Sequence, residues 1–234
     1  MRVVGGIAAA ITAIAIEACS MTGGGPTRTG IDQVPMYGGM DRSQYPDLRA
    51  ADDKFITDVT AHYGSREKAS VLLVEQGFVF YRQDNNAMAM RRFNQAWLLN
   101  PNNPEAYTGF ASVLFDDGKY CDAASMVDKA QSIGHVQDGF LPDAAFILVG
   151  CAMQGASPER KTALLARSDE LFVQALSSSA VQKAYTLTNW ATAMYARGDY
   201  ADAWAKVAEL RRTTGKDMSE QFLGRLSAKM PEPK

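Results

Sequence analysis

PEAYTGFASVLFDDGKYCDAASMVDKA, residues 104–130, is the stretch that decides the fold of this chain. Apolar and small side chains recur in it every three or four residues, on both sides of a turn around Gly118, where glycine permits backbone angles that other residues resist. This spacing gives each helix an apolar stripe that must be buried against a neighbour. The stretch therefore predicts two helices packed as a hairpin. The residues that carry the pattern are Tyr107, Phe110, Ala111, Leu114, Gly118, Tyr120, Ala123, Val127 and Ala130.

The pattern recurs at a fixed period. Counted from residue 104 as position 1, its residues fall at positions 4, 7, 8, 11, 15, 17, 20, 24 and 27, and a count from Ser70 places Gly77, Ala89 and Ala96 at positions 8, 20 and 27. Ser70 precedes residue 104 by 34 positions. The chain thereby resembles the tetratricopeptide repeat (TPR) family, whose unit is a 34-residue helix–turn–helix. The matched units are 70–103, 104–137, a degenerate unit at 143–178 and a last unit at 184–212.

The resemblance implies an all-α fold in which TPR hairpins stack into a right-handed superhelical solenoid. A segment with helical spacing, 47–69, precedes the repeats, and Gly64 and Ser65 are expected to end its helix. Residues 213–234 supply a capping helix and a tail. The degenerate unit holds about six extra residues near 154–161, either in its turn or as an additional helical turn.

Composition narrows the classes of function. The chain has 234 residues, 47% of them hydrophobic, and a formal net charge of −2 without a long run of one sign. Nucleic-acid binding requires a basic stripe that neutralises phosphates, so no nucleic-acid partner is expected. The two histidines, His62 and His135, are not at metal-ligand spacing, and no phosphate-binding loop, nucleophile elbow or zinc-protease motif occurs. The sequence therefore predicts no catalytic residues, no metal and no cofactor.

Residues 1–18 predict a signal peptide, because one cation precedes an apolar stretch that is too short and too rich in small residues for a membrane span. Residues 16–19, IEAC, resemble a bacterial lipobox, from which Glu17 departs. The resemblance implies lipidation of Cys19, and Ser20 behind it favours the outer membrane. The expectation is an exported outer-membrane lipoprotein that faces the periplasm, with another exported form as the alternative.

Residues 19–46 predict a flexible tether between the lipid anchor and the folded body. Glycine and proline recur through the segment and no apolar period survives, which is typical of a linker. An alternative stays open, in which Tyr37 and Tyr45 pack onto the repeats. The proline-rich end of the chain, 231–234, is expected to be disordered.

The TPR resemblance also implies where a partner binds. In that family the first helix of each unit lines a concave groove, with partner contacts at positions 2, 5, 9, 12 and 13. The lysine and asparagine clamp of chaperone-binding members is absent here, and large aromatic side chains suited to an apolar helix or extended peptide take its place. The alternative is that several of them pack against neighbouring helices. The groove candidates are Phe78, Tyr81, Arg82, Thr108, Ser112, Phe115, Tyr185, Thr188 and Tyr195.

Two cysteines remain besides Cys19. Cys121 begins the second helix of one unit and Cys151 lies in the first helix of the next, and such helices are neighbours in a TPR stack. In an oxidising periplasm two such cysteines can pair if their Cα atoms lie within about 7 Å. Two free, partly buried thiols are the alternative.

These expectations lead to a function. A non-catalytic scaffold or assembly factor of the bacterial cell envelope, which binds a partner protein or peptide in the groove, fits the signal, the repeats and the lack of catalytic motifs. A lipoprotein of Flp-pilus assembly is one member type that would fit. The alternative is a periplasmic enzyme, or a protein that binds a small molecule or glycan in the same groove.

Overall fold

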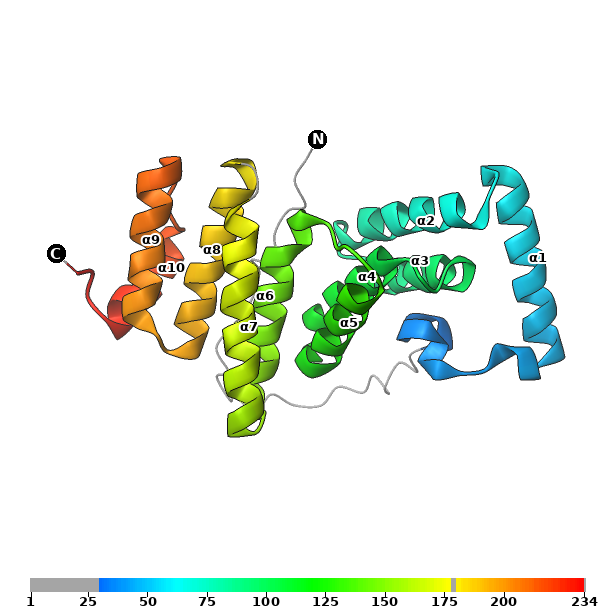
Figure 1. Ribbon diagram of the computed structural model, residues 1–234, viewed down its shortest axis with the longest axis horizontal. Helices are drawn as coiled ribbons and strands as arrows, with labels where there is room; N and C mark the ends of the chain where they lie inside the picture. Colours follow the sequence, from blue (N-terminus) through cyan, green and yellow to red (C-terminus); the bar gives the residue numbers. More distant parts are fainter. Residues whose placement is uncertain (1–29, 178–179, 234) are drawn as a thin grey trace, which may run out of the picture. The chain divides into compact units, whose positions relative to one another are not determined.

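The structure is a computed structural model that describes residues 30–177 and 180–233 (Figure 1). Within those ranges its regular secondary structure is helical and it contains no strand, which confirms the all-α prediction. The predicted signal peptide and Cys19 lie outside the described residues. The chain divides into two compact units, Met1–Pro101 and Asn102–Lys234, and each is described separately.

The described part of the first unit is built on a helical hairpin. Helix α2 (Arg66–Tyr81) packs along α3 (Asn86–Leu99), and α1 (Pro46–Tyr63) packs on α2. Side-chain caps set where α2 and α3 begin, because the Lys68 N–H donates to Ser65 Oγ and the Met88 N–H donates to Asn85 Oδ1, each at 3.1 Å. Within the segment predicted over 47–69 the helix ends at Tyr63, as expected from Gly64 and Ser65, because Gly64 is left-handed with φ +88°.

Three short 3₁₀ turns precede α1. They are η1 (Ile31–Gln33), η2 (Pro35–Gly39) and η3 (Arg42–Gln44); η1 and η2 contact α3, and η3 contacts α1. Tyr37 is only 6% exposed, whereas Tyr45 is 53% exposed. The prediction of a tether is therefore wrong for residues 30–45, and of the two tyrosines only Tyr37 packs onto the helices. A glycine- and proline-rich segment folds here because side chains of α1 and α3 bind it.

The second unit continues with helices in neighbouring pairs, α4 with α5, α6 with α7 and α8 with α9 (Figure 1). Helix α6 also packs against α5 and α8, and α10 packs on α9. These pairs coincide with the predicted hairpins. The bounds of the elements are α4 (Pro104–Asp116), α5 (Tyr120–Ile133), η4 (Asp138–Phe140), α6 (Leu141–Met153), α7 (Pro158–Leu176), α8 (Ala180–Arg197), α9 (Tyr200–Thr214) and α10 (Glu220–Lys229).

Small residues and glycine turns lie where the repeat pattern places them. Ala111 and Ala123 are fully buried where α4 meets α5. Gly118 and Gly198 occupy the turns after α4 and α8 with φ of +74° and +87°, a region that favours glycine. In the degenerate unit the surplus residues lengthen a helix, since α7 has 19 residues and α5 has 14.

The end of the chain is also held. The Trp204 indole N–H donates to the carbonyl oxygen of Met230 at 2.9 Å, and Arg211 pairs with Glu232 at 2.5 Å. In the tail predicted to be disordered, Glu232 makes this ion pair, while residues 231–233 are exposed and lie outside any helix.

Candidate protein interface

Helix α2 exposes two valines to solvent in the first unit, with Glu75 one turn from each of them. Val71 is 52% exposed and Val79 is 44% exposed, although valine is among the residues most often buried. A shallow, largely apolar hollow lies beside Val71, between α1 and α2. The residues that line it are Tyr63, Glu67, Lys68, Val71 and Leu72. Exposed valines beside a largely apolar hollow, with charged residues around them, mark this part of α2 as a candidate protein-binding surface.

Three of the groove candidates lie at the C-terminal end of α2. Phe78 is half-buried, and its ring centroid lies 5.0 Å from that of Phe93 and 6.4 Å from that of Tyr81. Arg82 is exposed and caps the helix, with its backbone N–H donating to the carbonyl oxygen of Phe78. The structure therefore brings Phe78, Tyr81 and Arg82 together, but part of Phe78 serves to hold α2 on α3.

Thr108 and Ser112 do not reach the surface. Both side chains are buried in α4. The Thr108 hydroxyl donates to the carbonyl oxygen of Glu105 at 2.9 Å, and the Ser112 hydroxyl donates to that of Thr108 at 3.0 Å. Assigning these two residues to an open groove is therefore wrong, because a hydroxyl that bonds to its own helix is easily buried.

The remaining aromatic candidates pack between helices. The Phe115 centroid lies 4.9 Å from that of Tyr120 in α5 and 5.6 Å from that of Phe146 in α6. Tyr195 lies 5.7 Å from Tyr200 and from Phe222, which belongs to α10. Both are half-buried, so the alternative that some candidates pack against neighbouring helices is the outcome for these residues. Thr188, in α8, is half-buried as well.

Tyr185 takes part in a polar pair that the repeat pattern did not indicate. Its hydroxyl, on α8, donates to Oδ1 of Asp143 on α6. Burial raises the pKa of Asp143 to about 7, and the charge of Asp116 adds to this increase. The hydrogen bond from Tyr185 acts in the opposite direction and lowers the pKa. A buried aspartate at the start of a helix gives no sequence signal that separates it from an exposed one.

Cys121 and Cys151 are joined by a disulfide, with their Cα atoms 4.5 Å apart. The bond links α5 to α6, and so ties one hairpin to the next. Of the two alternatives left open by the sequence, the structure contains the pair. Disulfides form and persist in oxidising compartments such as the bacterial periplasm.

The structure and the comparisons also bear on metal sites, membrane spans and family membership. Among the described residues no group of three or more His, Cys, Asp or Glu side chains is placed to hold a metal ion. In residues 30–177 and 180–233 no helix has both the length and the apolarity to cross a membrane. Comparison of the chain with protein-family models, curated proteins and solved structures finds no match.

Proposed function

We propose that the protein is a non-catalytic scaffold of the bacterial cell envelope, built from TPR-like hairpins, which binds a partner protein through the exposed face of α2. The observation that carries the proposal is this face, where Val71 stands in solvent beside the hollow at Tyr63 and Val79 is exposed two turns further along the helix. In TPR proteins the first helix of a hairpin lines the binding groove, and α2 is the first helix of its pair.

The chemistry of the face suggests the chemistry of the partner. Its two exposed valines alternate with charged residues of both signs, Glu67, Lys68, Glu75 and Arg82, all exposed. An amphipathic helix or extended segment that buries an apolar edge between mixed charges fits such a surface. The nearby aromatic pair of Phe78 and Tyr81 supplies rigid side chains of the kind that dominate binding energy at interfaces.

The cellular location rests on separate observations. The Cys121–Cys151 disulfide favours an exported protein, in agreement with the signal-like N-terminal sequence and with Cys19 in its lipobox-like context. An outer-membrane lipoprotein that faces the periplasm combines these features. Membership in an envelope assembly machine, of which Flp-pilus assembly is one kind, is the context in which such a scaffold would act.

The test is a pull-down from solubilised envelopes with native protein and a Val71→Glu/Val79→Glu variant. We expect the variant to lose at least nine-tenths of the captured partner, because two carboxylates would replace the two exposed valines without disturbing buried packing. The matched control is Val173→Glu, on α7, where the native side chain is 60% exposed. Capture of the same proteins by native protein, by the Val71→Glu/Val79→Glu variant and by Val173→Glu would contradict the proposal.

A further inference from the structure

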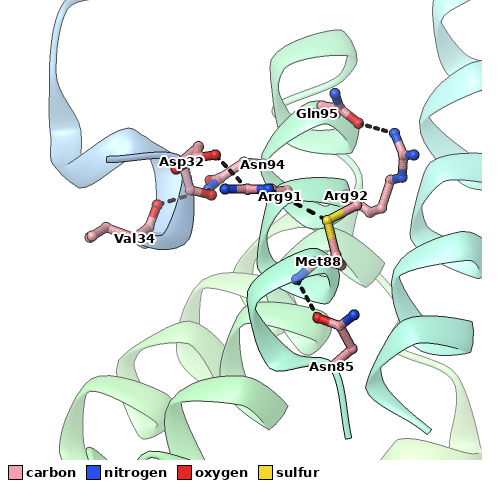
Figure 2. A network of polar contacts seen from close by, with 8 residues as sticks. All are labelled: Asp32, Val34, Asn85, Met88, Arg91, Arg92, Asn94 and Gln95. Atoms are coloured by element: carbon pink, nitrogen blue, oxygen red, sulfur yellow. Dashed lines mark hydrogen bonds and ion pairs between the residues drawn. The ribbon is translucent and has the colours of Figure 1, made fainter. Parts of the chain in front are cut away.

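Asn94 of α3 binds the main chain of residues 30–45, here called the N-terminal segment (Figure 2). The Asn94 side chain is fully buried, and its Nδ2 donates to the carbonyl oxygens of Asp32 and Val34, both at 2.9 Å. Its Oδ1 accepts the backbone N–H of Tyr37 at 3.4 Å. One amide thus uses both donors and its acceptor on the main chain of a single turn-forming segment.

Because these bonds go to backbone atoms, Asn94 recognises the course of a chain and not its side chains. Any peptide that follows the same turn would satisfy the same three bonds. A buried amide without partners is unfavourable. The N-terminal segment avoids this cost by supplying three hydrogen bonds to the Asn94 amide that it covers.

Two side chains of the segment add selectivity. Asp32 pairs with Arg91, the Nε to Oδ2 distance being 2.5 Å, at a site where both side chains stay about two-fifths exposed. Tyr37, five positions later, is buried with its ring 6.4 Å from that of Trp97, and desolvation raises its pKa to about 12. The site thus takes an acidic residue followed by an aromatic residue.

The segment fills this site at a conformational cost. Met36 and Tyr37 are left-handed, with φ of 51° and 52°, which is unfavourable for residues with a Cβ. The strain weakens the hold of α3 on this segment. A peptide with glycine in place of Met36 would make the same contacts with less strain, and would compete with the segment.

From these contacts we infer that α3 carries a second peptide-recognition site, separate from the face of α2. Residues 30–45 fill it in cis, and it accepts from a partner protein a turn-forming peptide with an acidic residue and an aromatic residue five positions on. Arg42, in η3, supports the cis state, since its guanidinium pairs with Asp52 of α1 through two bonds of 2.7 and 2.6 Å and lies 4.2 Å from the Tyr37 ring centroid.

Fluorescence anisotropy with the full chain tests the inference. The probe is a labelled peptide of residues 30–40 with Met36→Gly. We expect the Asp32→Ala/Tyr37→Ala protein, whose cis segment is weakened, to bind the probe at least tenfold more tightly than native protein does. Equal affinities for the two proteins, or no saturable binding to either, would overturn the inference. So would a dimer formed by exchange of the segment between two copies.

A charge swap makes the test independent of folding. A probe that carries Asp32→Lys in addition to Met36→Gly should bind the Asp32→Ala/Tyr37→Ala protein at least tenfold more weakly. Adding Arg91→Glu to that protein should restore the affinity. Arg91 is partly exposed, so this change leaves the helix intact. Arg92→Glu is the matched control, because Arg92 bonds to Gln95 and not to the segment (Figure 2). Restoration by both variants, or by neither, would contradict a site built on Arg91.

Discussion

At Gly77 the absence of one methyl group sets how closely α2 approaches α3. A Cβ built there would lie 2.4 Å from the Phe93 ring, which is itself fully buried. Such a ring has no free space into which it can move. Position 8 of this hairpin therefore requires a residue without a side chain, whereas the equivalent position of the next hairpin, Ala111, accommodates a methyl group.

Gly77→Ala should lower the free energy of unfolding by about 1–3 kcal/mol, because overpacking outweighs the gain in helix propensity. Gly224→Ala is the matched control, since Gly224 lies in α10 with nothing within 4 Å of the added Cβ, and this change should stabilise by up to about 1 kcal/mol. Urea unfolding measures both. A stabilising effect at Gly77 would contradict the packing described here.

Asp143 makes stability depend on pH in an unusual direction. Its pKa is about 7 in the folded chain, against roughly 3.9 in an unfolded one. The folded state therefore keeps a proton that the unfolded state releases. The stabilising contribution is complete below about pH 4 and is lost as pH rises through about 7, at up to about 1.4 kcal/mol per pH unit.

Asp143→Asn should flatten this dependence, because the amide stays neutral and its oxygen still accepts the Tyr185 hydroxyl. The measurement is the free energy of unfolding at pH 5 and pH 8 for native protein and variant. We expect the native protein to lose more stability than the variant between the two values. Parallel pH profiles would show that Asp143 titrates normally in the folded chain.

At the scale of elements, helices far apart in sequence are held by specific bonds as well as by apolar packing. The disulfide joins α5 to α6 across 30 positions, and Ser168 of α7 donates to the carbonyl oxygen of Ala145 in α6 at 2.9 Å. A covalent link of this loop length limits the freedom of the unfolded chain.

Reduction of the disulfide should cost about 3–4 kcal/mol of stability, as expected for a closed loop of this length. The melting temperature of the native protein should therefore fall when dithiothreitol is added. The Cys121→Ser/Cys151→Ala variant should melt at the lower temperature with or without the reductant. An unchanged melting temperature of the native protein after complete reduction would rule out a stabilising role.

At the scale of the whole molecule, the folded N-terminal segment shortens the connection to any lipid anchor. If Cys19 is lipidated, the chain from it to residue 30 spans at most about 40 Å when fully extended. A tether through residue 46 would reach more than twice as far. The first unit would therefore act close to the membrane surface.

Cys19→Ser should abolish labelling with radioactive palmitate and move the protein from the membrane fraction to the soluble periplasmic fraction. Ser20→Asp is the control, since it keeps the acceptor cysteine; labelling should persist while the protein moves to the inner membrane. Labelled Cys19→Ser protein would refute the anchor.

The sequence by itself determined the helices, their pairing into hairpins and the places of the turns. These features depend on local spacing and on residues such as Gly118, whose backbone freedom acts within a few positions. Only the tertiary structure decided which side chains face solvent and which distant segments meet. Asn94 binds a carbonyl 62 positions away, and Thr108 is buried despite its polar side chain. Such contacts arise from long-range packing, because neither the repeat period nor the type of a single residue specifies its partner in space.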